Sequence, residues 1–178
     1  VSAFGGIVSC NFKVGKKLSV ELNKLFLEVI IANNFDKDAL KLLKKKKNLR
    51  LIDASNYSFK EKLRFISSNE ELLLQTEDLN KFSNKDFKIV SKKKPTLKQM
   101  KNLIFAFNVC RYVKSNAIVL ARNETTVGIG SGQPSRLDSC QIAIDKMKKF
   151  MNIKDEIVAA SDAFFPFVDG IEKLIQSG

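Results

Sequence analysis

The chain has 178 residues, of which 44% are hydrophobic and 28% charged, and it contains no histidine. This composition excludes a disordered chain and allows one sizeable core or two small ones. The lack of histidine removes the commonest general base and the commonest transition-metal ligand from any chemistry that the chain performs alone. No apolar run approaches the roughly 20 residues needed to cross a bilayer, so we expect a soluble protein with no membrane partner.

The net charge of +12 comes largely from lysines, including runs at residues 44–47 and 92–94. Such runs attract nucleic acid, but neither is interleaved with the aromatic residues that stack bases. We interpret them as solvated surface and expect no nucleic-acid partner; an RNA-binding protein is the rival interpretation. The chain has three cysteines, Cys10, Cys110 and Cys140, which lie far apart in the sequence. An odd number of widely spaced cysteines indicates reduced thiols in a cytoplasmic protein.

The first part of the chain alternates between strand and helix patterns. The two glycines of SAFGGIV, residues 2–8, are explained by a bulged strand. A short helix is predicted over residues 18–26 and a buried, β-branched strand over 27–32. A helix over 35–47 and a strand over 49–54 follow, and this alternation predicts α/β layering.

Two further strands are predicted over residues 62–67 and 71–78, on either side of a polar tip, and a loop follows over 80–87. The polar stretch SKKKPT then indicates a boundary. We therefore divide the chain into a domain of residues 1–91 and a second of residues 92–178.

The second domain begins with a helix whose start is marked by a capping box. Thr96 and Gln99 have the required spacing, and an apolar stripe continues to Cys110. The remaining predicted elements are a hairpin of strands over 116–121 and 126–130, a helix capped by Ser135 and Asp138, a strand over 157–161 and a helix over 169–177.

The loop GIGSGQPSR, residues 128–136, is the sharpest local signal. Its three glycines allow positive φ and close backbone approach, and the loop leads into a helix N-terminus with free N–H groups. Arg136 adds a fork of donors, so the loop suits a phosphate or the oxyanion of an acyl-transfer intermediate. Gln133 replaces the third glycine of a dinucleotide-binding fingerprint. The alternative is a hairpin turn that leads to a capped helix.

Two other stretches concentrate polar and aromatic side chains. In SDAFFPFVDG, Pro166 forces Phe165 towards an extended conformation, so the turn offers either core aromatics or an apolar wall for a flat heterocycle. In VKSNAIV, Asn116 provides a donor and an acceptor and Lys114 a charge, although a surface loop explains the stretch equally well.

Six segments together resemble one known family. SAFGGIV, EVIIA, KKKKNLR, VKSNAIVLARN, GIGSGQPSRLDS and SDAFFPFVDGI occur in the order and approximate spacing of the AICAR transformylase domain of bifunctional purine biosynthesis proteins, which also carry an IMP cyclohydrolase. The resemblance covers essentially the whole chain. It implies a cytidine-deaminase-like three-layer α/β/α fold, built of two similar units, in an intertwined homodimer with active sites at the subunit interface.

The resemblance also implies a reaction. These enzymes transfer a formyl group from 10-formyltetrahydrofolate to the amino group of AICAR during purine biosynthesis in the cytoplasm, and the IMP cyclohydrolase domain is their covalent partner. The zinc signature of the deaminases is missing, since the chain has neither HxE nor PCxxC. We therefore expect no zinc and no deamination.

The resemblance assigns roles residue by residue. Asn116 and Lys114 match the catalytic region, where Asn116 would form hydrogen bonds near the formyl group. Asp162 and Ser115 match a monovalent-cation site that holds potassium. The positions that match substrate and folate contacts are Gln133, Ser135, Arg136, Leu137, Phe164, Pro166, Phe167 and Asp169.

One departure from the family bears on activity. The family's catalytic Lys-His pair lies upstream of these motifs, and this chain has no histidine. We therefore interpret the chain as the central part of a transformylase domain, truncated at both ends and nearly inactive alone. The alternative is a non-catalytic module that binds folate or a nucleotide.

Overall fold

The computed structural model describes residues 4–58, 63–150 and 156–178, and the chain divides into two compact units, residues 1–77 and 78–178. The first residues of the SAFGGIV motif and Lys62 lie outside the described residues. The division falls after residue 77, whereas the sequence predicts a boundary after residue 91. The segment in between belongs to the second unit by its contacts, because the Asn108 side chain bonds both main-chain groups of Phe82.

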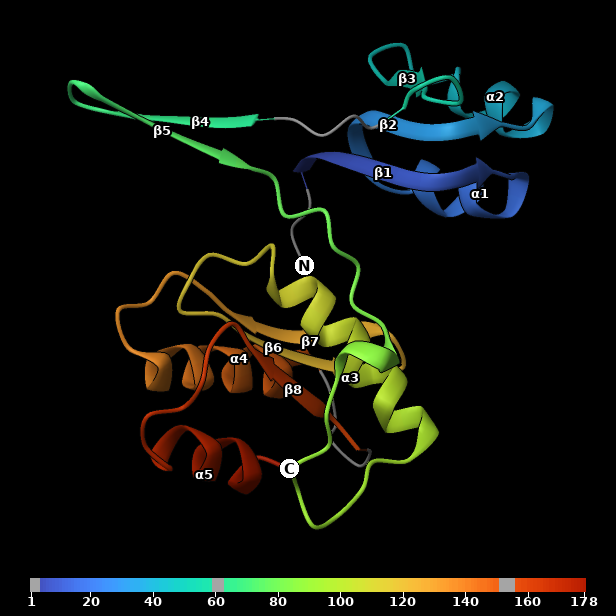
Figure 1. Ribbon diagram of the computed structural model, residues 1–178. Helices are drawn as coiled ribbons and strands as arrows, with labels where there is room; N and C mark the ends of the chain where they lie inside the picture. The colour runs from blue at the N-terminus through green and yellow to red at the C-terminus, as the bar shows by residue number, and fades with distance from the viewer. Residues whose placement is uncertain (1–3, 59–62, 151–155) are drawn as a thin grey trace. The chain divides into compact units, whose positions relative to one another are not determined.

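Unit 1 contains a parallel three-stranded sheet with the order β1-β2-β3 (Figure 1). Gly5 has a φ of +70° beside a shift in register between β1 and β2, which confirms the bulged strand. The sheet and its helices share one core that includes Val14, Ile30 and Leu43, so the expected α/β layering is confirmed. Its elements are β1 (Phe4–Val14), α1 (Lys16–Asn23), β2 (Phe26–Phe35), α2 (Lys37–Leu43) and β3 (Arg50–Asp53).

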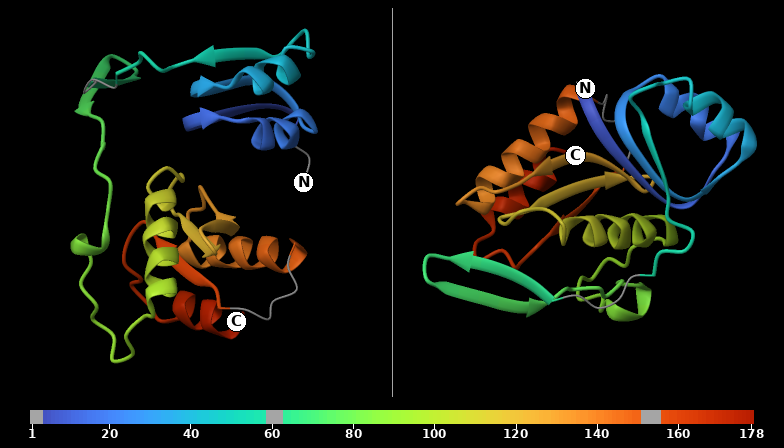
Figure 2. Two further views of the ribbon diagram at one scale, coloured as in Figure 1. Left: turned by 90° about the vertical axis from the view of Figure 1, so that its right-hand side faces the viewer. Right: turned by 90° about the horizontal axis from the view of Figure 1, so that it is seen from above.

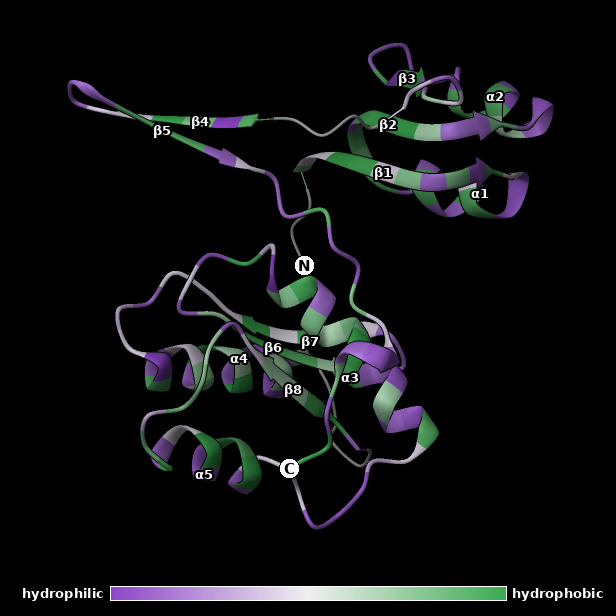
Figure 3. Ribbon diagram, viewed as in Figure 1, coloured by the Kyte–Doolittle hydropathy of each residue, from purple (hydrophilic) through white to green (hydrophobic). Residues whose placement is uncertain are grey.

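A two-stranded antiparallel hairpin, β4 (Leu63–Ser68) and β5 (Glu71–Thr76), follows and matches the predicted pair of strands. Asn69, at its tip, has a φ of 51°. All residues of both strands are exposed, and many of them are hydrophobic (Figure 3).

Unit 2 has three layers. Its sheet has the order β7-β6-β8 with antiparallel pairing throughout. Helix α3 lies on one face, and α4 lies on the other (Figure 2) with α5 packed against it. This arrangement confirms the predicted α/β/α fold class, while the assignment of two similar cytidine-deaminase-like units stays a prediction. The elements are η1 (Asn84–Asp86), α3 (Leu97–Cys110), β6 (Ile118–Arg122), β7 (Thr125–Gly130), α4 (Arg136–Phe150), β8 (Val158–Ser161) and α5 (Asp169–Gln176).

Strand β6 is the centre of unit 2 because both of its faces are buried. Successive side chains of a strand point to opposite faces. Accordingly Val119 and Ala121 belong to the core beneath α3, and Ile118 and Leu120 belong to the core beneath α4. Burial on both faces explains why this stretch is continuously apolar.

Two glycines of β7 let α4 approach the sheet closely. A Cβ atom on Gly128 would lie 2.1 Å from the carbonyl oxygen of Ala143, and one on Gly130 would lie 1.9 Å from that of Ser139. Neither glycine has a positive φ, whereas Gly132, in the loop that leads to α4, has a φ of +69°. The first turn of α4 is thereby fixed tightly against the sheet.

Thr96 and Gln99 form the predicted capping box at the start of α3. The Thr96 N–H donates to Gln99 Oε1 at 2.8 Å, and the Gln99 N–H donates to Thr96 Oγ1 at 3.2 Å. Across residues 4–58, 63–150 and 156–178, no helix has both the length and the apolar character that a membrane span requires.

Candidate functional site

Arg136, the first residue of α4, joins the glycine-rich loop to the end of β8. Its Nε donates a hydrogen bond to Ser161 Oγ at 3.0 Å, and its Nη2 donates to Asp162 Oδ1 at 2.8 Å. The guanidinium carbon lies 6.0 Å from the centroid of the Phe165 ring. The loop 128–136 and the segment 161–170 therefore lie side by side in unit 2.

Asp162 is a junction between three segments. Its Oδ1 also accepts a hydrogen bond from the Ala117 N–H at 3.1 Å, its Oδ2 accepts one from the Ser115 hydroxyl, and its own N–H donates to Ala117 O at 3.3 Å. The side chains of Arg136 and Asp162 are only 15% and 18% exposed, so water screens their ion pair weakly.

The charge state of Asp162 follows from these contacts. Burial alone would raise the pKa of the Asp162 carboxyl, but the hydrogen bonds from Ser115, Arg136 and Ala117 and the positive charge of Arg136 outweigh it and lower the pKa. The carboxylate is therefore ionised at neutral pH. Its pairing with Arg136 is lost only as the pH falls through this lowered pKa.

Asn116 ties the loop before α4 to the start of β6. Its Nδ2 donates to the carbonyl oxygens of Gln133 at 2.9 Å and Pro134 at 2.8 Å, and its own carbonyl oxygen accepts from Ser139 Oγ at 2.7 Å. The Lys114 carbonyl oxygen accepts a hydrogen bond from the Gly132 N–H at 2.8 Å, and the Lys114 side chain is exposed. Asn116 thus shapes the loop that presents Arg136.

The aromatic segment divides into buried and exposed parts. Phe164 and Phe167 are 79% and 74% exposed, so the interpretation of these two as core is wrong for this chain. Phe165 packs against the α4 core, and a Cβ on Gly170 would lie 2.9 Å from its ring. The turn therefore presents two aromatic side chains outwards while the third anchors it.

The predicted site residues separate into two groups. Ser115, Arg136 and Asp162 share one set of hydrogen bonds, and the adjacent Asn116 bonds separately to the main chain of Gln133. The others lie in the segments that flank this network, where Ser135 Oγ accepts from the Asp138 N–H at 3.4 Å and Asp169 begins α5. The flanking positions, whose functional roles stay predictions, are Lys114, Ser135, Leu137, Phe164, Pro166, Phe167 and Asp169.

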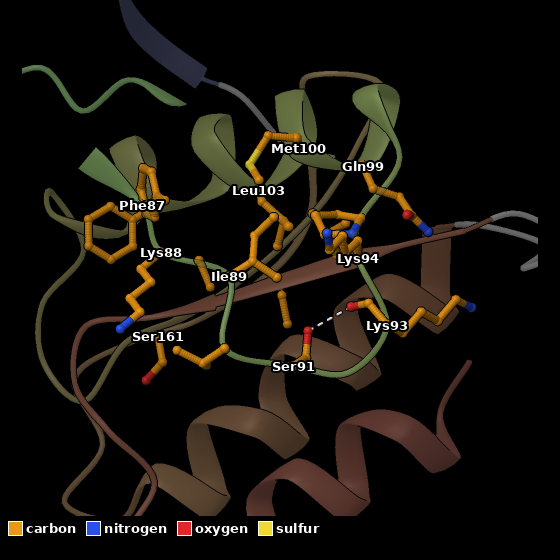
Figure 4. Close-up of a pocket in the computed structure, with 16 residues that line it drawn as sticks. Phe87, Lys88, Ile89, Ser91, Lys93, Lys94, Gln99, Met100, Leu103 and Ser161 are labelled. Carbon is orange, nitrogen blue, oxygen red and sulfur yellow. Dashed lines mark hydrogen bonds between the residues drawn. The ribbon is translucent and has the colours of Figure 1, made fainter. Parts of the chain in front are cut away.

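A cavity of about 580 Å³ lies between α3, β8 and residues 87–95 (Figure 4). Apolar side chains, including Ile89, Met100 and Leu103, line most of it, and lysines stand at its rim. None of the predicted site residues lines this cavity, but Ser161 does. The cavity has no local signal in the sequence, because residues 91–96 carry only the polar pattern of a boundary.

Ser161 is the residue of the Arg136 network that sequence reasoning missed. It is the last residue of β8 and accepts the Nε hydrogen bond of Arg136. The adjacent pair Ser161-Asp162 at the end of a strand is the signal that could have revealed it, because both side chains offer oxygen acceptors at the sheet edge.

The predicted cation position does not fit a potassium ion in this arrangement. Ser115 and Asp162 supply the oxygen donors that such an ion prefers. The Ser115 hydroxyl donates to Asp162, however, and the Arg136 guanidinium already provides the opposing charge 2.8 Å from the carboxylate. Within the described ranges, no three His, Cys, Asp or Glu side chains are grouped so that they could hold a metal ion.

The sequence of the chain matches a family of bifunctional enzymes. A family model described as "AICARFT/IMPCHase bienzyme" matches residues 1–146. The chain therefore belongs to this family, which unites an AICAR transformylase with an IMP cyclohydrolase.

Particular relatives agree with this assignment. Proteins named bifunctional purine biosynthesis protein PurH are 44% identical over 180 residues in Limosilactobacillus reuteri, 45% over 178 residues in Fusobacterium nucleatum and 44% over 179 residues in Aquifex aeolicus. The alignments cover 100% of this chain but only 34–35% of each relative. The chain thus spans about a third of the length of the curated relatives it matches.

Proposed function

We propose that the protein containing this chain transfers a formyl group from 10-formyltetrahydrofolate to AICAR in purine biosynthesis, and that unit 2 supplies the arginine-centred part of its active site. Family membership over residues 1–146 supports the reaction class. The observation that carries the proposal at residue level is the fixed Arg136, held by Ser161 and Asp162 beside the exposed aromatic turn.

In this mechanism the AICAR amine attacks the formyl carbon, and the carbonyl oxygen gains negative charge. The bond between the formyl carbon and the folate nitrogen then breaks, and tetrahydrofolate leaves. Arg136 donates to that oxygen, since a preorganised donor stabilises the charge that develops in the transition state. Because Asn116 shapes the loop before α4, it keeps Arg136 at the site. A base outside this chain must accept the proton of the amine. In the family, the Lys-His pair upstream of these motifs fills that place.

The exposed turn suits the folate. Phe164 and Phe167 offer an apolar wall to the pterin ring, and Asp169 offers a carboxylate acceptor for the polar edge of that ring. Both aromatic side chains are open to a ligand, as a binding wall requires.

We further propose that the whole protein works as a homodimer in the cytoplasm, with an IMP cyclohydrolase domain on the same chain. Because Asp162 already pairs with Arg136 and accepts from the Ser115 hydroxyl, we assign no potassium ion to this position, and no step of the mechanism uses one.

A labelled-formyl assay tests the proposed reaction. The full-length protein should transfer the labelled formyl group from 10-formyltetrahydrofolate to AICAR and release tetrahydrofolate in equal amount. The 178-residue chain alone should be nearly inactive, because it lacks the base. Turnover by the isolated chain would contradict that second expectation, and no turnover by the full-length protein would contradict the first.

The alternative is a non-catalytic module that binds folate or a nucleotide, and the absence of histidine favours it. Calorimetry separates the two proposals. Tight binding of a folate analogue or of AICAR by the 178-residue chain supports the module, whereas binding only by the full-length protein supports an active site completed by other segments.

A further inference from the structure

We infer that Ser161 and Asp162 are positioning residues that orient the Arg136 guanidinium for formyl transfer. This inference rests on the proposed function and deepens it, because it names the groups that set the direction of the donor. It also gives Asp162 a role as the counter-ion of Arg136, in place of a role as a cation ligand.

The geometry of the two hydrogen bonds carries the inference. Ser161 accepts a hydrogen bond from Arg136 Nε at 3.0 Å, and Asp162 accepts one from Nη2 at 2.8 Å. Two consecutive residues therefore bind two nitrogens of the planar guanidinium. Two such contacts fix the plane of a guanidinium as well as its position. Nη1 has no hydrogen bond within the part of the chain that the structure describes, so its donors are available to a ligand.

The acceptors themselves are rigidly held. Asp162 receives hydrogen bonds from Ala117 and Ser115 and donates its own N–H to Ala117 O at 3.3 Å. Ser161 pairs with Ile118 in the sheet. A donor can be preorganised only if its own partners cannot move, and these contacts meet that requirement.

The position of the pair argues against a purely structural role. Arg136 and Asp162 lie at the ends of α4 and β8, where the loops meet, and the side chains keep 15% and 18% of their surface exposed. The buried core of unit 2 is formed instead by the apolar residues of β6, α3 and α4. The pair therefore lies outside the apolar core of unit 2, where the loops at the ends of α4 and β8 meet.

Steady-state kinetics of the full-length protein test the inference. Asp162→Asn and Ser161→Ala should each lower the transformylase kcat/KM by about 10- to 100-fold, since a small misplacement of a catalytic group has effects of this size. Asp138→Asn is the matched control. It removes one carboxylate from the same first turn of α4 without touching Arg136, and should leave kcat/KM unchanged.

A double-mutant cycle distinguishes positioning from general stabilisation. If Asp162 acts through Arg136, then Asp162→Asn should have little further effect in an Arg136→Ala background. The cyclohydrolase activity of Asp162→Asn should match that of the wild type, although loss of the largely buried ion pair with Arg136 lowers the melting temperature. Additive effects of the two substitutions, or equal loss of both activities, would overturn the inference.

The outcome is also separable from that of the proposed function. Absence of formyl transfer in the wild-type protein contradicts the proposed function itself. Formyl transfer in the wild type that survives both Asp162→Asn and Ser161→Ala unchanged contradicts only the positioning role.

Discussion

The close approach of α4 to β7 makes Gly130→Ala a severe test of how this fold presents Arg136. The new Cβ would lie 1.9 Å from Ser139 O and 2.7 Å from Ser139 Cα. Reaching an ordinary contact of 3.4 Å requires a shift of 1.5 Å between strand and helix, because both partners are main-chain atoms that cannot rotate away. Ser139 also holds the Asn116 carbonyl oxygen through its hydroxyl, so the shift strains the same loop.

The magnitude follows from overpacking. Extra methyl groups forced into a packed core cost about 1–3 kcal/mol, and a clash with main chain falls at the upper end, about 3 kcal/mol. At about 2–4 °C per kcal/mol, a loss of that size should lower the temperature at which transformylase activity is lost by about 6–12 °C. The transformylase kcat should fall as well, since Arg136 moves with the first turn of α4.

Heat inactivation of the full-length variant measures the loss of stability, and the transformylase kcat before heating measures the effect on Arg136. The cyclohydrolase activity of the same protein is the internal reference. Gly6→Ala is the control: its Cβ would meet only the tip of the Leu27 side chain, at 3.0 Å, which can move aside. Wild-type heat resistance and wild-type formyl transfer in Gly130→Ala would refute the proposed packing of α4.

Two further predictions concern thiols and the segment before α3. Burial raises the pKa of Cys110 to about 11 and, less strongly, those of Cys140 and Cys10, but only Cys10 is partly exposed. Alkylation at pH 8 followed by peptide mapping should therefore label Cys10 first, and early labelling of Cys110 would contradict the packing of α3. Asn108→Ala removes both side-chain bonds to Phe82 and should cost about 1–3 kcal/mol while exposing the segment to protease. An unchanged cleavage rate in the segment around Phe82 would contradict the idea that the Asn108 hydrogen bonds hold it in place.

The sequence predicted the elements of this fold well because most of them carry local signals. The Thr96–Gln99 capping box and the short, continuously apolar stretch of β6 are examples in which residues a few positions apart determine the structure. The division between the units was harder to predict. It depends on contacts between Asn108 and Phe82, which are far apart in the chain and have no local signature.

In the candidate site, too, contacts between residues far apart in the chain could not be predicted from the sequence. The glycine-rich loop and the Phe-Pro turn were each visible as motifs, and the family resemblance linked them. The partners of Arg136 were not visible, because Ser161 and Asp162 approach it only after β8 has paired with β6. The roles of Gly128 and Gly130 were likewise clear only with α4 in place, since close packing rather than positive φ requires them.

The most direct test of this account is the formyl-transfer rate of Arg136→Ala in the full-length protein, measured beside Arg64→Ala, which changes an exposed arginine of the hairpin. Loss of an oxyanion donor typically lowers kcat by about 100- to 1,000-fold. We predict a loss of that size for Arg136→Ala, with cyclohydrolase activity unchanged, and no loss for Arg64→Ala. Full transformylase activity in Arg136→Ala would contradict the account.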